Sequence, residues 1–98
     1  MRLRYTLEAL DQIAAIHRYI HDRNPEAAAR VVSRIRAAAE RLESFPRIGH
    51  VGVAPGSYEW SVVGLPYVIV YQIAADEGEV VILGVFHGAQ QRRSQAPE

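Results

Sequence analysis

The sequence predicts an α+β domain in which a short N-terminal strand precedes an antiparallel two-helix hairpin and a three-stranded antiparallel meander. The helices are expected to pack on one face of the sheet. Three observations support this prediction. Charged and apolar residues alternate at the N-terminus, two later segments carry apolar stripes of helical period, and three β-rich segments follow a stretch of Gly and Pro. A chain of 98 residues is long enough for one domain only, so residues 1–98 are assigned to a single domain.

The N-terminal segment Arg2–Tyr5 alternates charged and apolar residues, which is typical of a strand with one buried side. Thr6 can accept a hydrogen bond at the start of a helix. The helix expected after it spans Leu7–Asp22, and its apolar stripe is Ala9, Ile13, Ile16 and Ile20.

A second helix is predicted from Pro25 to Ser44. Asn24 is a favourable N-cap, and the missing N–H of Pro25 costs nothing at the first helical position. About two residues separate the helices, so they must run antiparallel. The apolar stripe of this helix is Ala28, Val32, Ile35, Ala39 and Leu42.

An irregular stretch over 45–56 contains several Gly and Pro residues together with Ile48, Val51 and Val53, so we expect it to pack on the domain. The three strands of the meander are then expected at Tyr58–Val63, Tyr67–Ala74 and Glu79–His87.

The last two strands are apolar on both alternations. Strict alternation places Val80, Ile82 and Phe86 on one face of the sheet, opposite Val81, Leu83 and Val85. One helical hairpin covers only one face. The second face must therefore be covered by the 45–56 stretch, by a mobile tail over 90–98, or by another protein chain.

Composition excludes several classes of function. The chain has 11 acidic residues and 11 basic residues, all of them Arg, so it lacks the basic excess typical of nucleic-acid binding. It has no Cys, which removes disulfides and thiolate sites, and no apolar run long enough for a membrane span. A cytoplasmic protein is expected.

The sequence gives little support for catalysis or metal binding. No Cys nucleophile and no phosphate-binding Gly-rich loop is present. His17 and His21 are four residues apart, which is metal-ligand spacing, but no third ligand completes a usual signature. We expect no catalytic residues, no metal and no cofactor.

Three arginines of the second helix, Arg30, Arg34 and Arg41, fall on one side of it by helical geometry. This basic ridge suits an acidic partner, and a solvated helix face is the alternative. Trp60 and His87 also have two interpretations each: Trp60 anchors a partner or belongs to the core, and His87 contacts a partner or closes its strand by bonding a turn.

Four short motifs follow the N-terminal strand. They are Asn24-Pro25-Glu26-Ala27-Ala28, Phe45-Pro46-Arg47-Ile48-Gly49, Gly64-Leu65-Pro66-Tyr67-Val68-Ile69-Val70-Tyr71 and His87-Gly88-Ala89. In this order and spacing they resemble the ParE/RelE superfamily of toxins from bacterial type II toxin–antitoxin systems. The resemblance extends from Leu3 to about Gln90.

The resemblance implies a ParD-like antitoxin that wraps the toxin in a hetero-oligomer, and in the ParE branch it implies DNA gyrase as the target. The residues expected to bind the antitoxin are Arg30, Arg34, Arg41, Ile48, Val51, Tyr67, Ile69 and Tyr71. Those expected to contact the target are Trp60, His87, Gln90, Arg92 and Arg93.

Two alternatives accompany this interpretation. The RelE branch cleaves mRNA on the ribosome with Lys, Arg and a C-terminal Tyr, but this chain has no Lys, carries Val68 where that branch has Arg, and has no Tyr after Tyr71. We therefore favour the ParE-like activity. Tyr58 and Gln90 stand where many ParE relatives carry Arg, so a non-toxic relative that only binds antitoxin is the third possibility.

Overall fold

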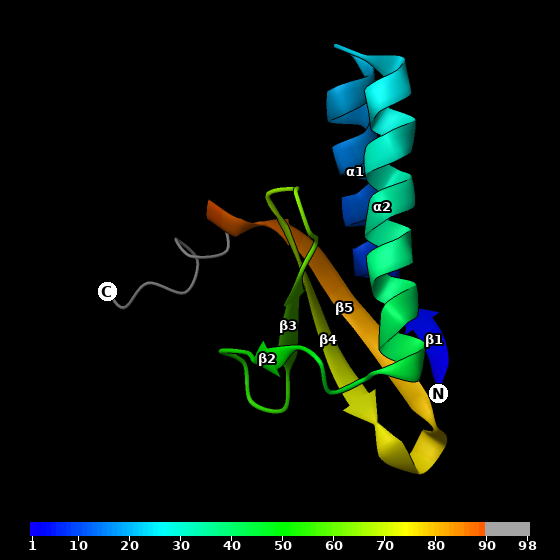
Figure 1. Ribbon diagram of the computed structural model, residues 1–98, viewed down its shortest axis with the longest axis vertical. Helices are drawn as coiled ribbons and strands as arrows, with labels where there is room; N and C mark the ends of the chain where they lie inside the picture. Colours follow the sequence, from blue (N-terminus) through cyan, green and yellow to red (C-terminus); the bar gives the residue numbers. More distant parts are fainter. Residues whose placement is uncertain (90–98) are drawn as a thin grey trace.

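A computed structural model describes residues 1–89 and confirms the predicted α+β fold (Figure 1). The predicted tail, 90–98, lies outside these residues, as do Gln90, Arg92 and Arg93. In chain order the elements are β1 (Arg2–Tyr5), α1 (Leu7–His21), α2 (Pro25–Ser44), β2 (His50–Val51), β3 (Tyr58–Ser61), β4 (Tyr67–Ala74), a 3-10 turn (Ala75–Glu77) and β5 (Glu79–His87).

The sheet has five strands in the order β1-β5-β4-β3-β2. The meander β3–β4–β5 is antiparallel as predicted, whereas β1 pairs parallel with the first half of β5. The Arg4 Nε lies 3.3 Å from Glu79 Oε1 across this pair. The hairpin of α1 and α2 lies on one face of the sheet, and its far end extends beyond the β3–β4 turn (Figure 1).

Both helices begin at the predicted caps. The Thr6 hydroxyl accepts a hydrogen bond from the Ala9 N–H at 3.1 Å, and the Asn24 side-chain oxygen accepts one from the Ala27 N–H at 3.1 Å. Each cap satisfies a backbone donor that has no partner within its helix. Helix α1 ends at His21, one residue earlier than predicted.

A β-bulge changes which face of the sheet the side chains of β5 lie on. Val70 pairs with Gly84 and Tyr71 with Ile82, so Leu83 is an extra residue on β5. The bulge puts Val85 on the same face as Ile82, and Phe86 faces the other side with its partner Val68. The strict alternation predicted for β5 is therefore wrong beyond Ile82.

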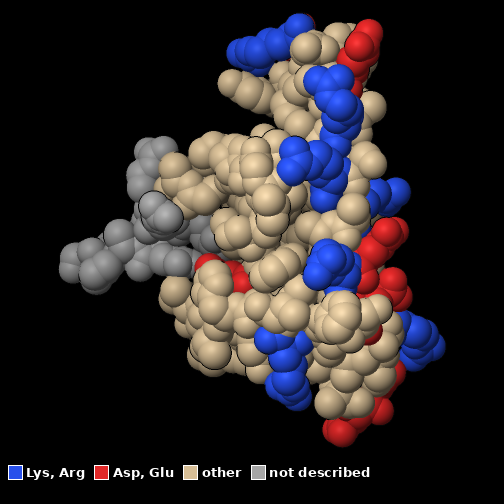
Figure 2. Space-filling view, viewed as in Figure 1, with Lys and Arg blue, Asp and Glu red and all other residues tan. Residues whose placement is uncertain are grey.

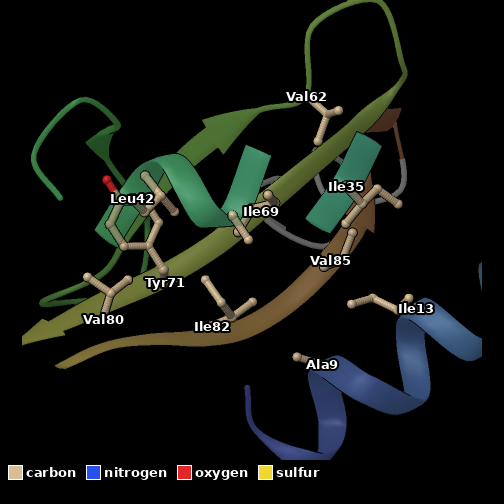
Figure 3. Close-up of a cluster of buried hydrophobic side chains, with 11 residues drawn as sticks. Ala9, Ile13, Ile35, Leu42, Val62, Ile69, Tyr71, Val80, Ile82 and Val85 are labelled. Carbon is tan, nitrogen blue, oxygen red and sulfur yellow. The ribbon is translucent and has the colours of Figure 1, made fainter. Parts of the chain in front are cut away.

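The core lies between the helices and the inner face of the sheet (Figure 3). Helix α1 contributes Ala9 and Ile13, and α2 contributes Ile35 and Leu42. The remaining large buried side chains come from the sheet and from Val62, which follows β3; those of the sheet are Ile69, Tyr71, Val80, Ile82 and Val85.

The stretch between α2 and β3 packs on the domain only in part. Ile48 packs against the core, whereas the Val51 and Val53 side chains are 78% and 65% exposed. The stretch contains β2, a two-residue strand that the sequence did not predict, paired with Tyr58 and Glu59. No helix among residues 1–89 is long and apolar enough to cross a membrane.

Candidate partner-binding grooves

Two grooves flank the sheet beneath the helical hairpin, one at each edge. The α2–β3 groove has a volume of about 480 Å³ and is lined by Arg34, Ala37, Ala38, Arg41, Trp60, Ser61, Val62 and Val63. The α1–β5 groove has a volume of about 620 Å³ and is lined by Gln12, Ala15, Ile16, Tyr19, Pro66, Tyr67, Val85, Phe86 and His87.

Helix α2 forms one wall of the α2–β3 groove with side chains from two successive turns. Residues three, four and seven apart share one face of a helix, so the two alanines lie between Arg34 and Arg41. On the opposite wall, Trp60 is half-buried against the core and Val62 is 3% exposed. Trp60 therefore packs on the core and also lines the groove, while its role as a partner anchor stays a prediction.

The rim of the α2–β3 groove is basic. The Arg34 guanidinium donates a hydrogen bond to the Val63 carbonyl, and the Arg41 guanidinium carbon lies 5.9 Å from the centre of the Phe45 ring. Among residues 1–89, neither guanidinium forms an ion pair with a carboxylate. On this face of the molecule, basic side chains form a band down the front and the acidic ones lie mostly along one margin (Figure 2).

The α1–β5 groove lies along an open strand edge. Strand β1 pairs with β5 only as far as Ile82, so in the described part of the chain the edge of Leu83–His87 faces α1 and not another strand. One backbone donor of this edge is satisfied, since Val85 N–H donates to the Gln12 side-chain oxygen at 2.8 Å.

Aromatic side chains gather at the outer end of the α1–β5 groove. The Tyr67 and His87 rings meet edge to face, with their centres 5.9 Å apart. Burial raises the pKa of the Tyr67 hydroxyl, and the nearby Tyr19 raises it further. The His87 Nδ1 accepts a hydrogen bond from the Ala89 N–H at 3.2 Å, which matches the strand-closing role considered for it.

The predicted antitoxin-binding residues do not form one surface. Arg34 and Arg41 share the α2–β3 groove with Trp60, and Arg30 lies outside its lining. Tyr67 lines the other groove with His87.

Two of the predicted antitoxin contacts are corrected by burial. Ile69 and Tyr71 are 0% exposed because both face the helices from the central strand β4. A side chain without exposed area cannot touch a partner. Tyr71 is instead bonded within the chain, and Tyr58 stacks on it with ring centres 5.5 Å apart.

Sequence reasoning missed Gln12, Tyr19 and the two alanines of the α2–β3 groove. The alanines had a signal, since they lie between two arginines of the predicted ridge. Gln12 and Tyr19 had none, because their role depends on where β1 ends beside β5. The His17 and His21 rings stack 5.5 Å apart, and no cluster of three metal-ligating side chains occurs among residues 1–89.

Comparison with known proteins gives concordant matches. Residues 3–92 match the family described as the ParE toxin of the type II toxin-antitoxin system, parDE. The protein Y4kP of Sinorhizobium fredii is 41% identical over 90 residues, which cover 92% of this chain and 91% of that protein. Toxin RelE2 of Caulobacter vibrioides is 36% identical over 86 residues, which cover 88% of this chain and 93% of that protein.

The fold is also similar to a solved structure, the chromosomal ParDE TA system from P. aeruginosa. The TM-score is 0.73 at 20% sequence identity, and the match covers 89% of this chain and 95% of that chain.

Proposed function

This chain belongs to the ParE toxin family of type II toxin–antitoxin systems, and from that membership we propose that it inhibits DNA gyrase and is neutralised by a cognate ParD-like antitoxin. The observation that carries the proposal is the absence of basic side chains from the two central strands. Neither Tyr67–Ala74 nor Glu79–His87 contains an Arg or a Lys.

Cleavage of RNA through its 2′-hydroxyl requires a base, an acid and cations that stabilise the charge of the transition state. Val68, at the position where RelE-type toxins place an Arg, lies beside Phe86 and Ser61 on the face of the sheet away from the helices. This position therefore supplies no cation for the transition state, since neither neighbour of Val68 is positively charged. It suits a protein that inhibits its target by binding.

The decisive experiment measures DNA supercoiling and DNA cleavage by purified gyrase in the presence of the chain. We expect supercoiling to be lost and double-strand cleavage to be stabilised. The control is the chain preincubated with the antitoxin encoded beside its gene, which restores supercoiling. Undiminished supercoiling at a large molar excess of the chain contradicts the proposal.

Ribosome-dependent mRNA cleavage is the second candidate, favoured by the relative that carries the name RelE2. Translating ribosomes are incubated with the wild-type chain and with Val68→Arg, and the mRNA is mapped for cuts. If the wild-type chain cuts the mRNA, its function is ribosome-dependent mRNA cleavage and not gyrase inhibition. Cuts by the variant alone mean that this scaffold lacks only its cation.

A further inference from the structure

The α2–β3 groove joins an apolar hollow to two guanidiniums that lack carboxylate partners among the described residues. We propose that this groove receives an acidic amphipathic segment of the antitoxin, with aliphatic side chains in the hollow and carboxylates on Arg34 and Arg41. The inference rests on the proposed function for the identity of the partner, and adds where that partner binds and by which chemistry.

The hollow exists because α2 has its smallest side chains where the helix faces β3. Ala37 and Ala38 leave open space that the Trp60 ring and the nearly buried Val62 close on the other side. A volume of about 480 Å³ accommodates several side chains. Trp and Arg are among the residues that most often carry binding energy at protein interfaces.

The two guanidiniums define the charge of the partner and the spacing of its acidic groups. Arg34 and Arg41 are seven residues apart, which is about 10 Å along a helix axis. The bond from Arg34 to the Val63 carbonyl keeps its side chain at the rim before any partner arrives. Arginine pairs with carboxylates through two parallel hydrogen bonds, so a segment with two carboxylates about 10 Å apart fits the rim.

The same charges argue against a second copy of this chain as the occupant. A two-fold dimer through this groove would bring the basic rims of both copies together, and like charges facing each other at an interface oppose association. A basic or neutral partner would leave Arg34 and Arg41 unpaired as their water is removed. An acidic partner avoids both penalties.

The test uses the single tryptophan of the chain as a reporter, because Trp60 lines the groove. The chain is produced with 5-fluorotryptophan, and the intact antitoxin is titrated while the ¹⁹F resonance and the binding heat are recorded. We expect the resonance to shift in proportion to occupancy. Raising the salt concentration should weaken binding, since the rim contacts are charged.

Two matched variants each remove one positive charge from α2. Arg41→Gln changes the rim, and we expect it to weaken antitoxin binding about tenfold or more. Arg36→Gln is the control because Arg36 lies against the Tyr5 ring, away from the groove, and it should change affinity less than twofold. Circular dichroism and thermal melting of both variants verify that the fold is kept.

Equal affinity of wild type and Arg41→Gln, or an unchanged Trp60 resonance at saturation, overturns the inference. So does an antitoxin that does not bind at all. The gyrase assay is read separately. If the antitoxin relieves gyrase inhibition equally well for wild type and Arg41→Gln, the proposed function holds and the proposed binding groove is wrong. If the antitoxin binds in a way that depends on Arg41 but the chain does not inhibit gyrase, the proposed binding groove holds and the gyrase proposal is wrong.

Discussion

The Tyr71 hydroxyl joins the core to the loop that follows α2. It donates a hydrogen bond to the Pro46 carbonyl at 2.7 Å and accepts one from the Gly49 N–H at 3.1 Å, while its ring is fully buried. The backbone of Gly49 comes so close that an added Cβ would lie 2.5 Å from the hydroxyl oxygen. The Tyr71 hydroxyl therefore bonds to the loop at two places, Pro46 and Gly49.

Replacing Tyr71 with Phe should lower the free energy of unfolding by about 1–3 kcal/mol, because two backbone groups lose their partner. Urea denaturation measures the change. Tyr58→Phe is the control, since the Tyr58 hydroxyl only accepts a long 3.4 Å bond from Arg47 at the surface, and we expect a change below about 0.5 kcal/mol. Equal losses in the two variants would contradict the role assigned to Tyr71.

Alkaline pH should destabilise the fold through its tyrosines. Burial raises the pKa of Tyr71 above its ordinary value of 10.0, the hydrogen bond from Gly49 opposes the shift, and Tyr5 and Tyr67 are also raised, chiefly by burial. Above pH 10 the unfolded chain loses these protons first, so the contribution to stability is complete below pH 10 and is lost as pH rises.

The measurement of this effect is the free energy of unfolding between pH 8 and pH 11. We expect it to fall above pH 10, and to fall less steeply in Tyr71→Phe because one raised group is gone. A variant that declines as steeply as the wild type would show that Tyr71 does not contribute to the alkaline loss.

At the scale of elements, helix α1 and its N-cap residue Thr6 contact the bulge of β5. The Thr6 hydroxyl lies 3.1 Å from the Ile82 carbonyl oxygen and 3.2 Å from that of Leu83, and the Gln12 side chain accepts from the Val85 N–H. The bulge moves Val85 into the core, so these contacts connect the first helix to the last strand.

Gln12→Met removes the acceptor for Val85 while it keeps the length of the side chain. We expect a loss of about 1–3 kcal/mol in the free energy of unfolding, because a backbone donor of the bulge loses its partner. Hydrogen exchange at the Val85 amide should accelerate with it. Gln12→Glu retains the acceptor oxygen and should exchange more slowly than Gln12→Met, and the reverse order would exclude the proposed bond.

At the scale of the whole molecule, a partner should contribute substantially to stability, because a domain of this size buries a modest core. Antitoxin at one hundred times its dissociation constant should stabilise the chain by about 2.7 kcal/mol. For a domain of this size the melting temperature then rises by roughly 10–20 °C. Calorimetry across antitoxin concentrations measures the rise, and a melting temperature independent of concentration would contradict it.

The arrangement of helices and strands could be predicted because its signals are local. Thr6 and Asn24 begin the helices with bonds to backbone groups three residues away, and the apolar spacing of Ile13, Ile35 and Leu42 selects the faces that enter the core. Such contacts depend on neighbours in the chain, so the sequence shows them directly.

The grooves and the strand facing required the tertiary structure, because they depend on residues far apart in the chain. The bulge at Leu83 reverses the alternation that the β5 sequence predicts. Ile69 and Tyr71 are not part of the predicted antitoxin surface, because both are buried on β4, a central strand beneath the helices.

The family, the two helices and the meander could be predicted from the sequence alone. The pairing of β1 with β5 and the groove that Arg34 and Arg41 share with Trp60 became visible in the folded chain. Both features join residues that are far apart along the chain. A groove between residues 34–41 and 60–63 is formed by the packing of a helix on a sheet edge, and no local pattern of either segment contains it.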